Sequence, residues 1–360
     1  MTSASPHKKR LALLGAFPPP YGGVAVHIER LRPLLDERGV SHHTYNAVTE
    51  TEVPGVSSVV KNRSRWFLRY LATGEEDVVY LFSDRLSAWT LAAAACRVRR
   101  KSLVINLRNS RLLDWMDQQP WKAEAAARVL REATLVVAVS RKLEEACWTL
   151  GIDKRRVVYA PAFLPPPSHD VDNRGKVADG VWEFVGRHPR YIAANGNVKW
   201  HEGEDLYGID LMVELMGRLK DDEPDLGMVI CFWNHSENDQ AYLDQLIARA
   251  DELGVRDRIL FNTAIGQFVP VLKDAALFLR PTNTDGDAVS VRESLYLGVP
   301  TVVSDAVERP PGALLHRSRD IDDLEAKARQ ALRGEVDRNA DGGLAENQRV
   351  VEHYLQALGG

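Results

Sequence analysis

The chain has 360 residues, of which 45% are hydrophobic and 27% charged, a composition that predicts a soluble protein with enough apolar residues for two hydrophobic cores. Its apolar runs are much shorter than the ~20 residues of a membrane-spanning helix, and the run after the basic N-terminus is too short for a signal peptide. We therefore expect a cytoplasmic protein. The cysteines, Cys96, Cys147 and Cys231, have neither metal-ligand nor redox spacing, so we expect them to be reduced core residues.

Charge is distributed unevenly along the chain. Residues 1–165 carry 25 Lys and Arg against 16 Asp and Glu, a net charge of +9, whereas the remainder carries 21 against 34, a net charge of −13. The basic half is expected to face an anionic partner. Its positive residues are spread over several elements and form no recognisable nucleic-acid module. We therefore expect a phosphorylated acceptor or an anionic membrane surface, and no nucleic acid.

The first predicted βα unit begins with a buried strand at Leu11–Ala16. The loop FPPPYGG follows, and its Gly22 and Gly23 bare backbone amides at the start of a predicted helix, Val24 to Arg38. Pro33 should kink this helix. A glycine pair after a strand indicates either a tight turn or a ligand-binding loop, and both interpretations remain open at this point.

A basic, aromatic segment follows the next predicted strand, at 42–46. In KNRSRWFLRYL, residues 61–71, four basic side chains are interleaved with Trp66, Phe67, Leu68 and Tyr70. This pattern suits a membrane interface, and it equally suits a surface helix that buries one side. After a strand at 78–82, an Ala-rich helix at 85–100 runs into RVRRK, which we assign to the same positive face.

Arg108 is a candidate binding residue in the first half. It comes directly after the predicted strand Leu103–Leu107, at the strand end where open α/β sheets bind their ligands; the alternative is an ordinary surface arginine. Ser140 is expected to cap the helix that follows a strand at 135–139, before a last strand at 157–159. The Pro-, Gly- and Asp-rich stretch at 165–180 lacks periodicity and is predicted to be a linker between two domains.

The clearest pattern in the second half is RPTNTDGDAVSVRESLYLGVPTVVSD, residues 280–305. The apolar run 275–279 predicts a strand, the polar residues after it a loop, and a helix follows at about Ala288–Leu297 with Asp287 as its expected N-cap. Gly298 suits the left-handed residue after a helix end, and a β-branched strand follows, which completes a βαβ unit. The other predicted elements of this half are strands at 191–194 and 228–232 and helices at 239–254 and 267–274.

The start of that helix is a candidate anion site. Its first backbone N–H groups, near Ala288 and Val289, lack intrahelical partners, and the helix dipole is positive there. Glu293 lies one turn on along the same face as Val289, where its carboxylate can accept hydrogen bonds from a ribose. Asp285 projects from the loop and could hold hydroxyls of a sugar attached to a diphosphate. The alternative is that Asp285 and Asp287 only shape the loop and that Glu293 is a solvated acid.

Asp285 and Glu293, with seven residues between them, resemble the acidic signature of the retaining GT-B glycosyltransferases of family 4, which usually have Glu at both positions. The segments RPT, TDGD, RE and LGVP are similar to a bacterial branch that assembles surface polysaccharides. The resemblance implies an α/β fold of two Rossmann-like domains with parallel sheets facing across a cleft. We expect an acceptor-binding domain at 1–165, a nucleotide-sugar-binding domain at 166–342, and a C-terminal helix within 343–360 that packs back on the first domain.

The resemblance also implies roles for individual residues. Asp285 would contact the donor sugar, Glu293 the ribose, and the helix amides the phosphates, without a metal or another cofactor. In the first domain, His27 would lie near the acceptor or donor, and Arg108 stands where family members often have His. The catalytic residues are thus expected to be Asp285, His27 and Arg108.

Two cations that hold the donor diphosphate in the family are missing here. Asn197 follows Gly196 where an Arg is usual, and Tyr207 precedes Gly208 where a Lys is usual. Other basic residues and the helix amides are expected to compensate. The predicted donor-binding residues are Gly22, Gly23, Asn197, Lys199, Arg280, Asp287, Ala288, Val289, Arg292 and Glu293.

Two other functions and a metal site are alternatives. An NAD-dependent oxidoreductase would share the fold class, but no G-x-G-x-x-G follows either domain's first strand. A non-catalytic relative acting as a scaffold or partner subunit would be consistent with the missing cations. Asp285-Gly286-Asp287 also spells D-x-D, which binds a divalent metal in single-domain glycosyltransferases; because it precedes a helix in a GT-B-like second half, we expect no metal.

The expected activity is transfer of a sugar, with retention, from a nucleotide-diphosphate sugar to a hydroxyl of a glycan or lipid-pyrophosphate-linked acceptor. The branch that the sequence resembles implies a role in surface polysaccharide or exopolysaccharide biosynthesis. Because the first half is basic, we also expect peripheral binding to the inner face of the plasma membrane.

Overall fold

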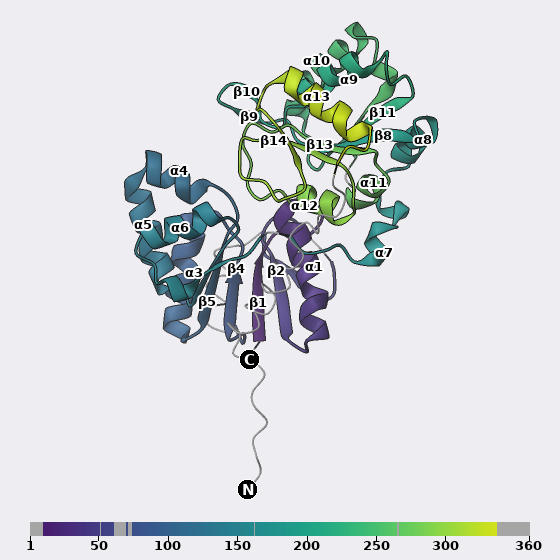
Figure 1. The fold of residues 1–360 in the computed structure, drawn as a ribbon. Helices are drawn as coiled ribbons and strands as arrows, with labels where there is room; N and C mark the ends of the chain where they lie inside the picture. Colours follow the sequence, from purple (N-terminus) through teal and green to yellow (C-terminus); the bar gives the residue numbers. More distant parts are fainter. Residues whose placement is uncertain are drawn as a thin grey trace. The chain divides into compact units, whose positions relative to one another are not determined.

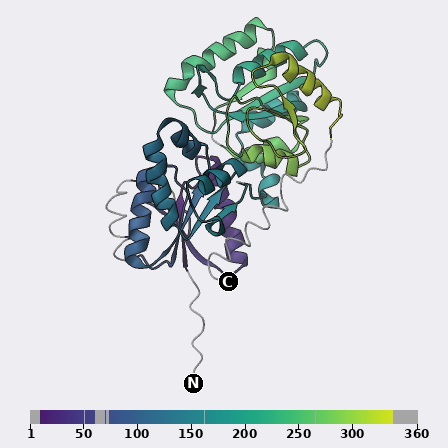
Figure 2. The same ribbon diagram turned by 60° about the vertical axis from the view of Figure 1, so that its left-hand side comes forward.

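The computed structural model describes residues 10–50, 52–60, 70, 74–161, 163–264 and 266–336. The chain divides between Leu164 and Pro165 into two compact units. Each unit is an α/β layer structure with helices on both faces of a parallel sheet (Figures 1 and 2). Two predictions lie outside the described residues: the basic aromatic helix of residues 61–69 and the C-terminal helix.

The first unit is built on a seven-stranded parallel sheet with the strand order β3-β2-β1-β4-β5-β6-β7. The order reverses between β1 and β4, which makes the carboxyl ends of these two strands the topological switch point. The strands are β1 (Arg10–Gly15), β2 (Ser41–Asn46), β3 (Val56–Ser58), β4 (Val78–Leu81), β5 (Ser102–Leu107), β6 (Leu135–Ala138) and β7 (Val157–Tyr159).

The helices of the first unit cover this sheet on both sides. Leu11 and Leu13, two apart on β1 and therefore on one face, pack against Ile28, Leu31 and Leu35 of α1. Ser140 caps α6 as predicted, since its Oγ accepts a hydrogen bond from the Leu143 amide at 3.3 Å. The helices are α1 (Gly23–Glu37), α3 (Leu86–Arg99), α4 (Arg111–Gln118), α5 (Pro120–Glu132) and α6 (Arg141–Thr149).

The second unit repeats this plan with six parallel strands in the order β12-β11-β8-β13-β14-β15, so its switch point lies between β8 and β13. A two-stranded hairpin, β9 (Trp200–His201) with β10 (Glu204–Asp205), follows β8. The sheet strands are β8 (Arg190–Gly196), β11 (Leu226–Phe232), β12 (Ile259–Asn262), β13 (Leu277–Arg280), β14 (Thr301–Ser304) and β15 (Leu314–His316).

The two faces of this sheet are buried in separate cores, as alternation along β8 shows. Ile192 and Ala194 belong to one hydrophobic cluster and Tyr191 and Ala193 to the other, because successive side chains of a strand point to opposite faces. Helices cover both faces, so the central residues of the strands are mainly apolar. These helices are α8 (Asp179–Arg187), α9 (Ile209–Leu219), α10 (Gln240–Glu252), α11 (Val269–Lys273), α12 (Val289–Tyr296) and α13 (Ile321–Leu332).

The stretch predicted as a linker, 165–180, lies directly after the boundary between the units and is partly helical. It contains α7 (Ser168–Val171) and a 3₁₀ turn, and α8 begins at Asp179. Lys176 donates to the buried carboxylate of Asp170 at 2.7 Å, which closes the segment on itself. Val181 and Phe184 of α8 anchor it in the core. The Pro and Gly residues of this stretch are typical of turns, and they do not predict these short helices.

Candidate functional site

The predicted donor site lies at the carboxyl edge of the second sheet, around its switch point. Arg280 is the last residue of β13, Asn197 follows β8, and a loop leads from Arg280 into α12. Ligands of open α/β sheets bind at this edge because the loops there surround the reversal of strand order.

A buried charge network occupies the start of that loop. Asp285 accepts two hydrogen bonds from Arg280, Nε to Oδ2 at 2.7 Å and Nη2 to Oδ1 at 3.2 Å, and one from Arg309 Nη1 at 3.1 Å. The side chains of Asp285, Arg280 and Arg309 are only 11%, 7% and 2% exposed. Since one carboxylate faces two guanidinium groups, the network carries a net charge of +1.

The pKa values of this network follow from burial and pairing. Burial acts to raise the pKa of Asp285, but the neighbouring Arg280 and Arg309 outweigh it and hold that pKa below its usual value. Burial lowers the pKa of Arg309, against the opposing effect of Asp285. Asp285 is therefore ionised, and it orients both arginines.

Arg309 is the residue that the sequence analysis missed. It follows β14 and joins the loops at this sheet edge, since its Nη2 donates to Thr282 Oγ1 at 2.8 Å and its Nε to the Ser304 carbonyl at 3.1 Å. A signal was present: a basic residue a few positions after a predicted strand of a parallel sheet lies at the ligand-binding edge. The segment that resembles the family motif, residues 280–305, ends before Arg309.

The two nearby helices differ at their first turns. The α9 amides are already occupied, because Asp205 accepts from the Ile209 amide at 2.9 Å and the Asp210 amide at 3.4 Å. In α12 the N-cap is Ala288, and among the described residues no side chain caps the helix. The α12 amides at Ala288 and Val289 are thus the open anion-binding end at this edge.

The prediction that Asp287 caps α12 was wrong. Its Oδ1 accepts from Arg292 Nε at 2.5 Å, and both side chains are buried. A charge-assisted bond to a guanidinium is stronger than one to a neutral amide, and the N-cap falls one residue later, at Ala288. The end of the helix is as predicted, since Gly298 has the left-handed φ of 70°. Both carboxylates of the D-x-D sequence are therefore paired with arginines.

The remaining predicted donor residues are distributed around this loop. Glu293 is buried on α12, next to Arg292. Asn197 is buried too, and its Oδ1 accepts from the Asn234 amide at 3.1 Å, which ties the loop after β8 to the loop after β11. Lys199 is exposed beside the β9–β10 hairpin, outside the buried network.

Tyr207, at the position of the second missing cation, is part of the same arrangement. The guanidinium of Arg280 lies over its ring, 5.3 Å from the centroid, a favourable cation–π contact. Gly208 is required beside it, because its φ is +65° and a Cβ there would lie 2.4 Å from the Pro281 carbonyl oxygen. Arg280 thus brings a cation to the place where the usual lysine is missing.

The first-unit candidates gather at the carboxyl edge of the first sheet. Gly22 is the N-cap of α1 and Gly23 its first residue. Arg108 follows β5 and donates from Nη2 to the Gly23 carbonyl at 3.4 Å, so these predicted residues lie together. His27 is 2% exposed on α1, and its ring lies 5.6 Å from that of Phe82.

The described residues contain no group of three or more His, Cys, Asp or Glu arranged to hold a metal ion. They also include no helix that is both long and apolar enough to span a bilayer.

Comparison with known proteins gives a family-model match over part of the second half of the chain. Residues 201–343 match the family model described as glycosyl transferases group 1, and this range contains α12 and the Arg280–Asp285–Arg309 network. A search among curated proteins found no match.

Solved structures share the fold over the whole chain. HepE (Alr3699) of Anabaena, solved in complex with UDP and with UDP-glucose, has 14% identity and a TM-score of 0.65, over 97% of this chain and 100% of that one. A glycosyltransferase from Rickettsia africae has 12% identity and a TM-score of 0.62, over 98% and 96%. A sucrose-phosphate synthase from Thermosynechococcus elongatus has 14% identity and a TM-score of 0.64, over 97% and 96%.

At these identities the likeness shows the fold alone. The expectation of a GT-B, α/β protein with two Rossmann-like domains is confirmed. The chain therefore combines this fold with a second half that matches the glycosyl transferases group 1 model over residues 201–343.

Proposed function

We propose that the protein is a retaining glycosyltransferase that takes a sugar from a UDP-sugar or a related nucleotide-diphosphate sugar. The observation that carries this proposal is the uncapped N-terminus of α12 within the region that matches the group 1 model. HepE, which shares the fold, was solved with UDP-glucose, and this supports UDP as the first nucleotide to test. The acceptor is a hydroxyl of a glycan or lipid-linked compound, in surface polysaccharide biosynthesis.

In this proposal the diphosphate sits on the amides of Ala288 and Val289. The positive end of α12 and the +1 charge network both favour an anion there. Glu293 accepts hydrogen bonds from the ribose. Asp285 contacts the donor sugar. Because its carboxylate oxygens accept hydrogen bonds from Arg280 and Arg309, it also positions those two cations.

The chemical step rests on electrostatic stabilisation. As the bond from the sugar to the diphosphate breaks, negative charge grows on the leaving phosphate and positive charge on the sugar ring. Amides and buried guanidinium groups held in place before the reaction stabilise the leaving group without reorganising. The acceptor hydroxyl attacks from the face that the diphosphate leaves and gives its proton to the departing phosphate oxygen, so the configuration is retained. No metal or cofactor is part of this proposal.

A panel of nucleotide sugars tests the proposal by thermal shift. A ligand present at 100 times its dissociation constant stabilises the folded protein by about 2.7 kcal/mol. We expect one nucleotide sugar and its nucleoside diphosphate to raise the melting temperature, and the matching free sugar to leave it unchanged. Stabilisation by none of the panel would contradict the proposal.

Glu293→Gln should weaken binding of the nucleoside diphosphate by roughly tenfold, since a hydrogen bond to a charged group contributes ~1.5–3 kcal/mol. Calorimetry checks this against Glu308→Gln, a control at an exposed glutamate outside α12. An unchanged affinity in Glu293→Gln would remove the ribose role while leaving the phosphate site untouched.

The replaced clamp residues favour one second candidate, a relative that binds the donor without transferring its sugar. Asn197 and Tyr207 stand where cations are usual. Binding of a nucleotide sugar with no release of nucleoside diphosphate, whatever the acceptor, would support this candidate over the transferase.

Peripheral membrane binding through the first unit is a further part of the proposal. Leu91 and Val98, seven residues apart on α3 and so on one helix face, are 52% and 78% exposed. Arg97, Arg99 and Arg100 beside them are exposed as well. An apolar stripe flanked by cations suits the surface of an anionic bilayer, where each basic residue contributes about 1 kcal/mol.

Changing Arg97, Arg99 and Arg100 together to Glu should abolish binding to anionic vesicles at low salt. Co-sedimentation with the vesicles measures this binding. The wild-type protein should be released from the vesicles at high salt, because salt screens the attraction between the basic residues and the anionic lipids. Lys154, Arg155 and Arg156, exposed on a 3₁₀ turn of the same unit, provide a control triple with the same change of charge. Equal pelleting of wild type and the α3 variant would contradict membrane binding through this helix.

A further inference from the structure

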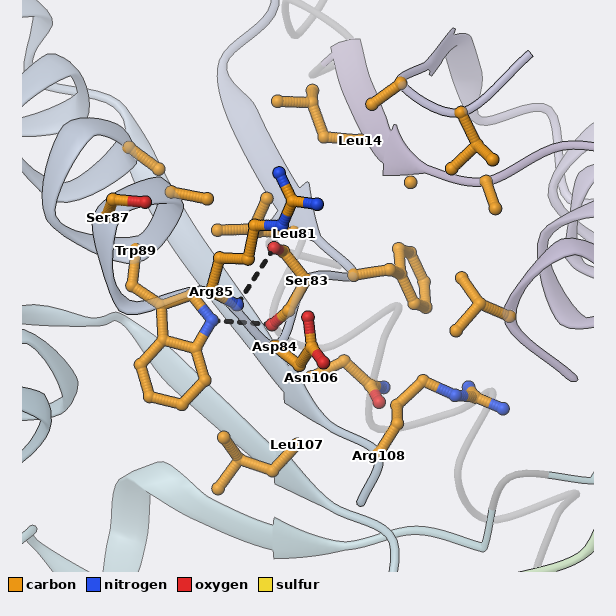
Figure 3. A pocket seen from close by; sticks show the side chains of 18 of the residues that line it. Leu14, Leu81, Ser83, Asp84, Arg85, Ser87, Trp89, Asn106, Leu107 and Arg108 are labelled. Carbon is orange, nitrogen blue, oxygen red and sulfur yellow. Dashed lines mark hydrogen bonds between the residues drawn. The ribbon is translucent and has the colours of Figure 1, made fainter. Parts of the chain in front are cut away.

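A large cavity opens at the switch point of the first sheet. Its volume is about 800 Å³, within the range of pockets that enclose a drug-sized molecule. Its walls come from the carboxyl ends of β1, β2, β4 and β5 and from helices α1, α3 and α4, all within the first unit (Figure 3). This is the position where open α/β sheets bind a ligand.

The walls of the cavity are mainly apolar. Leu14, Leu81 and Leu107 come from the strand ends, and Ala88 and Trp89 from α3. The Trp89 indole N–H is already bonded to the Ser83 carbonyl at 2.6 Å, so it is not available to a ligand. A bare glycan, whose hydroxyls need hydrogen-bond partners all round, would leave most of them unsatisfied against such walls. An apolar body fits them.

One buried polar atom in this lining lacks a partner. Asn106, on β5, is 2% exposed; its Nδ2 donates to the Tyr80 hydroxyl at 2.7 Å, and in the described part of the chain its Oδ1 has no hydrogen bond. The side chain lies in the interior of the pocket (Figure 3). An unsatisfied buried polar atom costs about 1–3 kcal/mol, which a suitable ligand group recovers.

The chemistry of Asn106 selects a hydroxyl. A carboxamide carries an acceptor oxygen and a donor nitrogen that exchange places when the group turns over. A hydroxyl both donates and accepts, so it satisfies whichever of the two atoms faces the cavity. Of the charged residues in the lining, Asp84 pairs with Arg111 at 3.3 Å, and Arg85 and Arg108 add two further cations at the edge.

We propose that this cavity binds an apolar alcohol or phenol, with its hydroxyl on the Asn106 carboxamide and its carbon skeleton against the leucines and Trp89. This inference rests on the proposed function and specifies its acceptor: the compound that receives the sugar carries an apolar, hydroxyl-bearing part that the first unit holds in this cavity. The proposal therefore predicts an acceptor with a lipid or aromatic part and excludes an acceptor that is purely a glycan.

Fluorescence titration of the full chain, without a nucleotide sugar, tests the binding. The probes are 2-naphthol and 2-methylnaphthalene, which differ by a hydroxyl in place of a methyl group. We expect wild type to bind 2-naphthol more tightly by about 5- to 30-fold, the fold-change that corresponds to ~1–2 kcal/mol for a buried hydrogen bond. Equal affinities for the two probes would overturn the proposal.

Two variants separate the role of Asn106 from its structural bond to Tyr80. Asn106→Leu removes both the Tyr80 bond and the unpartnered oxygen, whereas Tyr80→Phe removes only the former. We expect the preference for 2-naphthol to disappear in Asn106→Leu and to persist in Tyr80→Phe. A preference that persists in both would overturn the role of Asn106.

If Asn106→Leu fails to fold, two substitutions by a bulky side chain, one inside the cavity lining and one outside it, test the cavity itself. Ala88→Trp on α3 should fill the cavity and reduce binding of both probes at least tenfold, while Ala94→Trp, exposed on the same helix and outside the lining, should not. Binding by Ala88→Trp equal to wild type would place the probes elsewhere and overturn the proposal.

The outcome is independent of the test of function. If a sugar is transferred to a glycan and the cavity binds neither probe, this inference fails and the transferase stands. If the cavity binds 2-naphthol and no nucleotide sugar stabilises the protein, the cavity stands and the proposed function fails.

Discussion

Asp285→Asn is expected to lower the free energy of unfolding of the second unit by about 3–5 kcal/mol, the cost of removing one partner from a buried ion pair. The neutral amide would leave Arg280 and Arg309 buried, 7% and 2% exposed, without a counter-charge. Urea unfolding followed by tryptophan fluorescence measures the change. Asp257→Asn, at an exposed aspartate of the same unit, is the control and should change stability by less than about 0.5 kcal/mol.

The same network predicts a pH dependence with a definite sign. The pKa of Asp285 is lower in the folded protein than in the unfolded chain, where it is about 3.9. Its contribution is therefore fully present above that unfolded value and is lost as the pH falls through the folded one. The stability difference between wild type and Asp285→Asn should be constant from pH 7 to 5 and shrink below about pH 4. A difference under about 1 kcal/mol at pH 7 would show that the network is not a buried ion pair in solution.

Ala288→Asp is expected to reduce the affinity for a nucleoside diphosphate by about 100-fold or more. An aspartate at the N-cap would place its own carboxylate on the α12 amides that no side chain now caps. Unit charges 4–6 Å apart repel by roughly 3–4 kcal/mol at an effective dielectric constant of ~20. The helix itself should become more stable, by about 1 kcal/mol, so binding is lost without loss of folding. Calorimetry with UDP measures the affinity.

Ala288→Asn is the matched control for that prediction. Asparagine caps a helix about as well as aspartate but carries no charge, so it competes for the same amides without repelling the phosphates. We expect its affinity for UDP to fall by less than about tenfold. Equal affinities of the Asp variant and wild type would show that the diphosphate is held away from α12.

The fold and the βαβ unit that carries the candidate donor site could be predicted because their signals are local. The loop and α12 follow from polar residues and helical periodicity within about 20 positions, and Gly298 marks the helix end through its left-handed φ. The acidic spacing of Asp285 and Glu293 depends on the same short stretch.

Long-range pairing could not be predicted from those signals. Arg309 meets Asp285 across 24 positions, because the ends of β13 and β14 lie side by side in the sheet. Asp287 was expected to cap α12, yet the stronger charge-assisted bond to Arg292 prevails. The cavity around Asn106 depends on four strand ends and three helices, and no single segment of the sequence contains it.

The central claim, that the α12 N-terminus holds the donor diphosphate, is tested most directly by a crystal structure of the protein with UDP. We predict phosphate oxygens at about 2.7–3.2 Å from the first-turn amides of α12, the range of N–H···O hydrogen bonds, with the ribose hydroxyls on Glu293. UDP bound in the first-unit cavity, or at any other site away from α12, would contradict it.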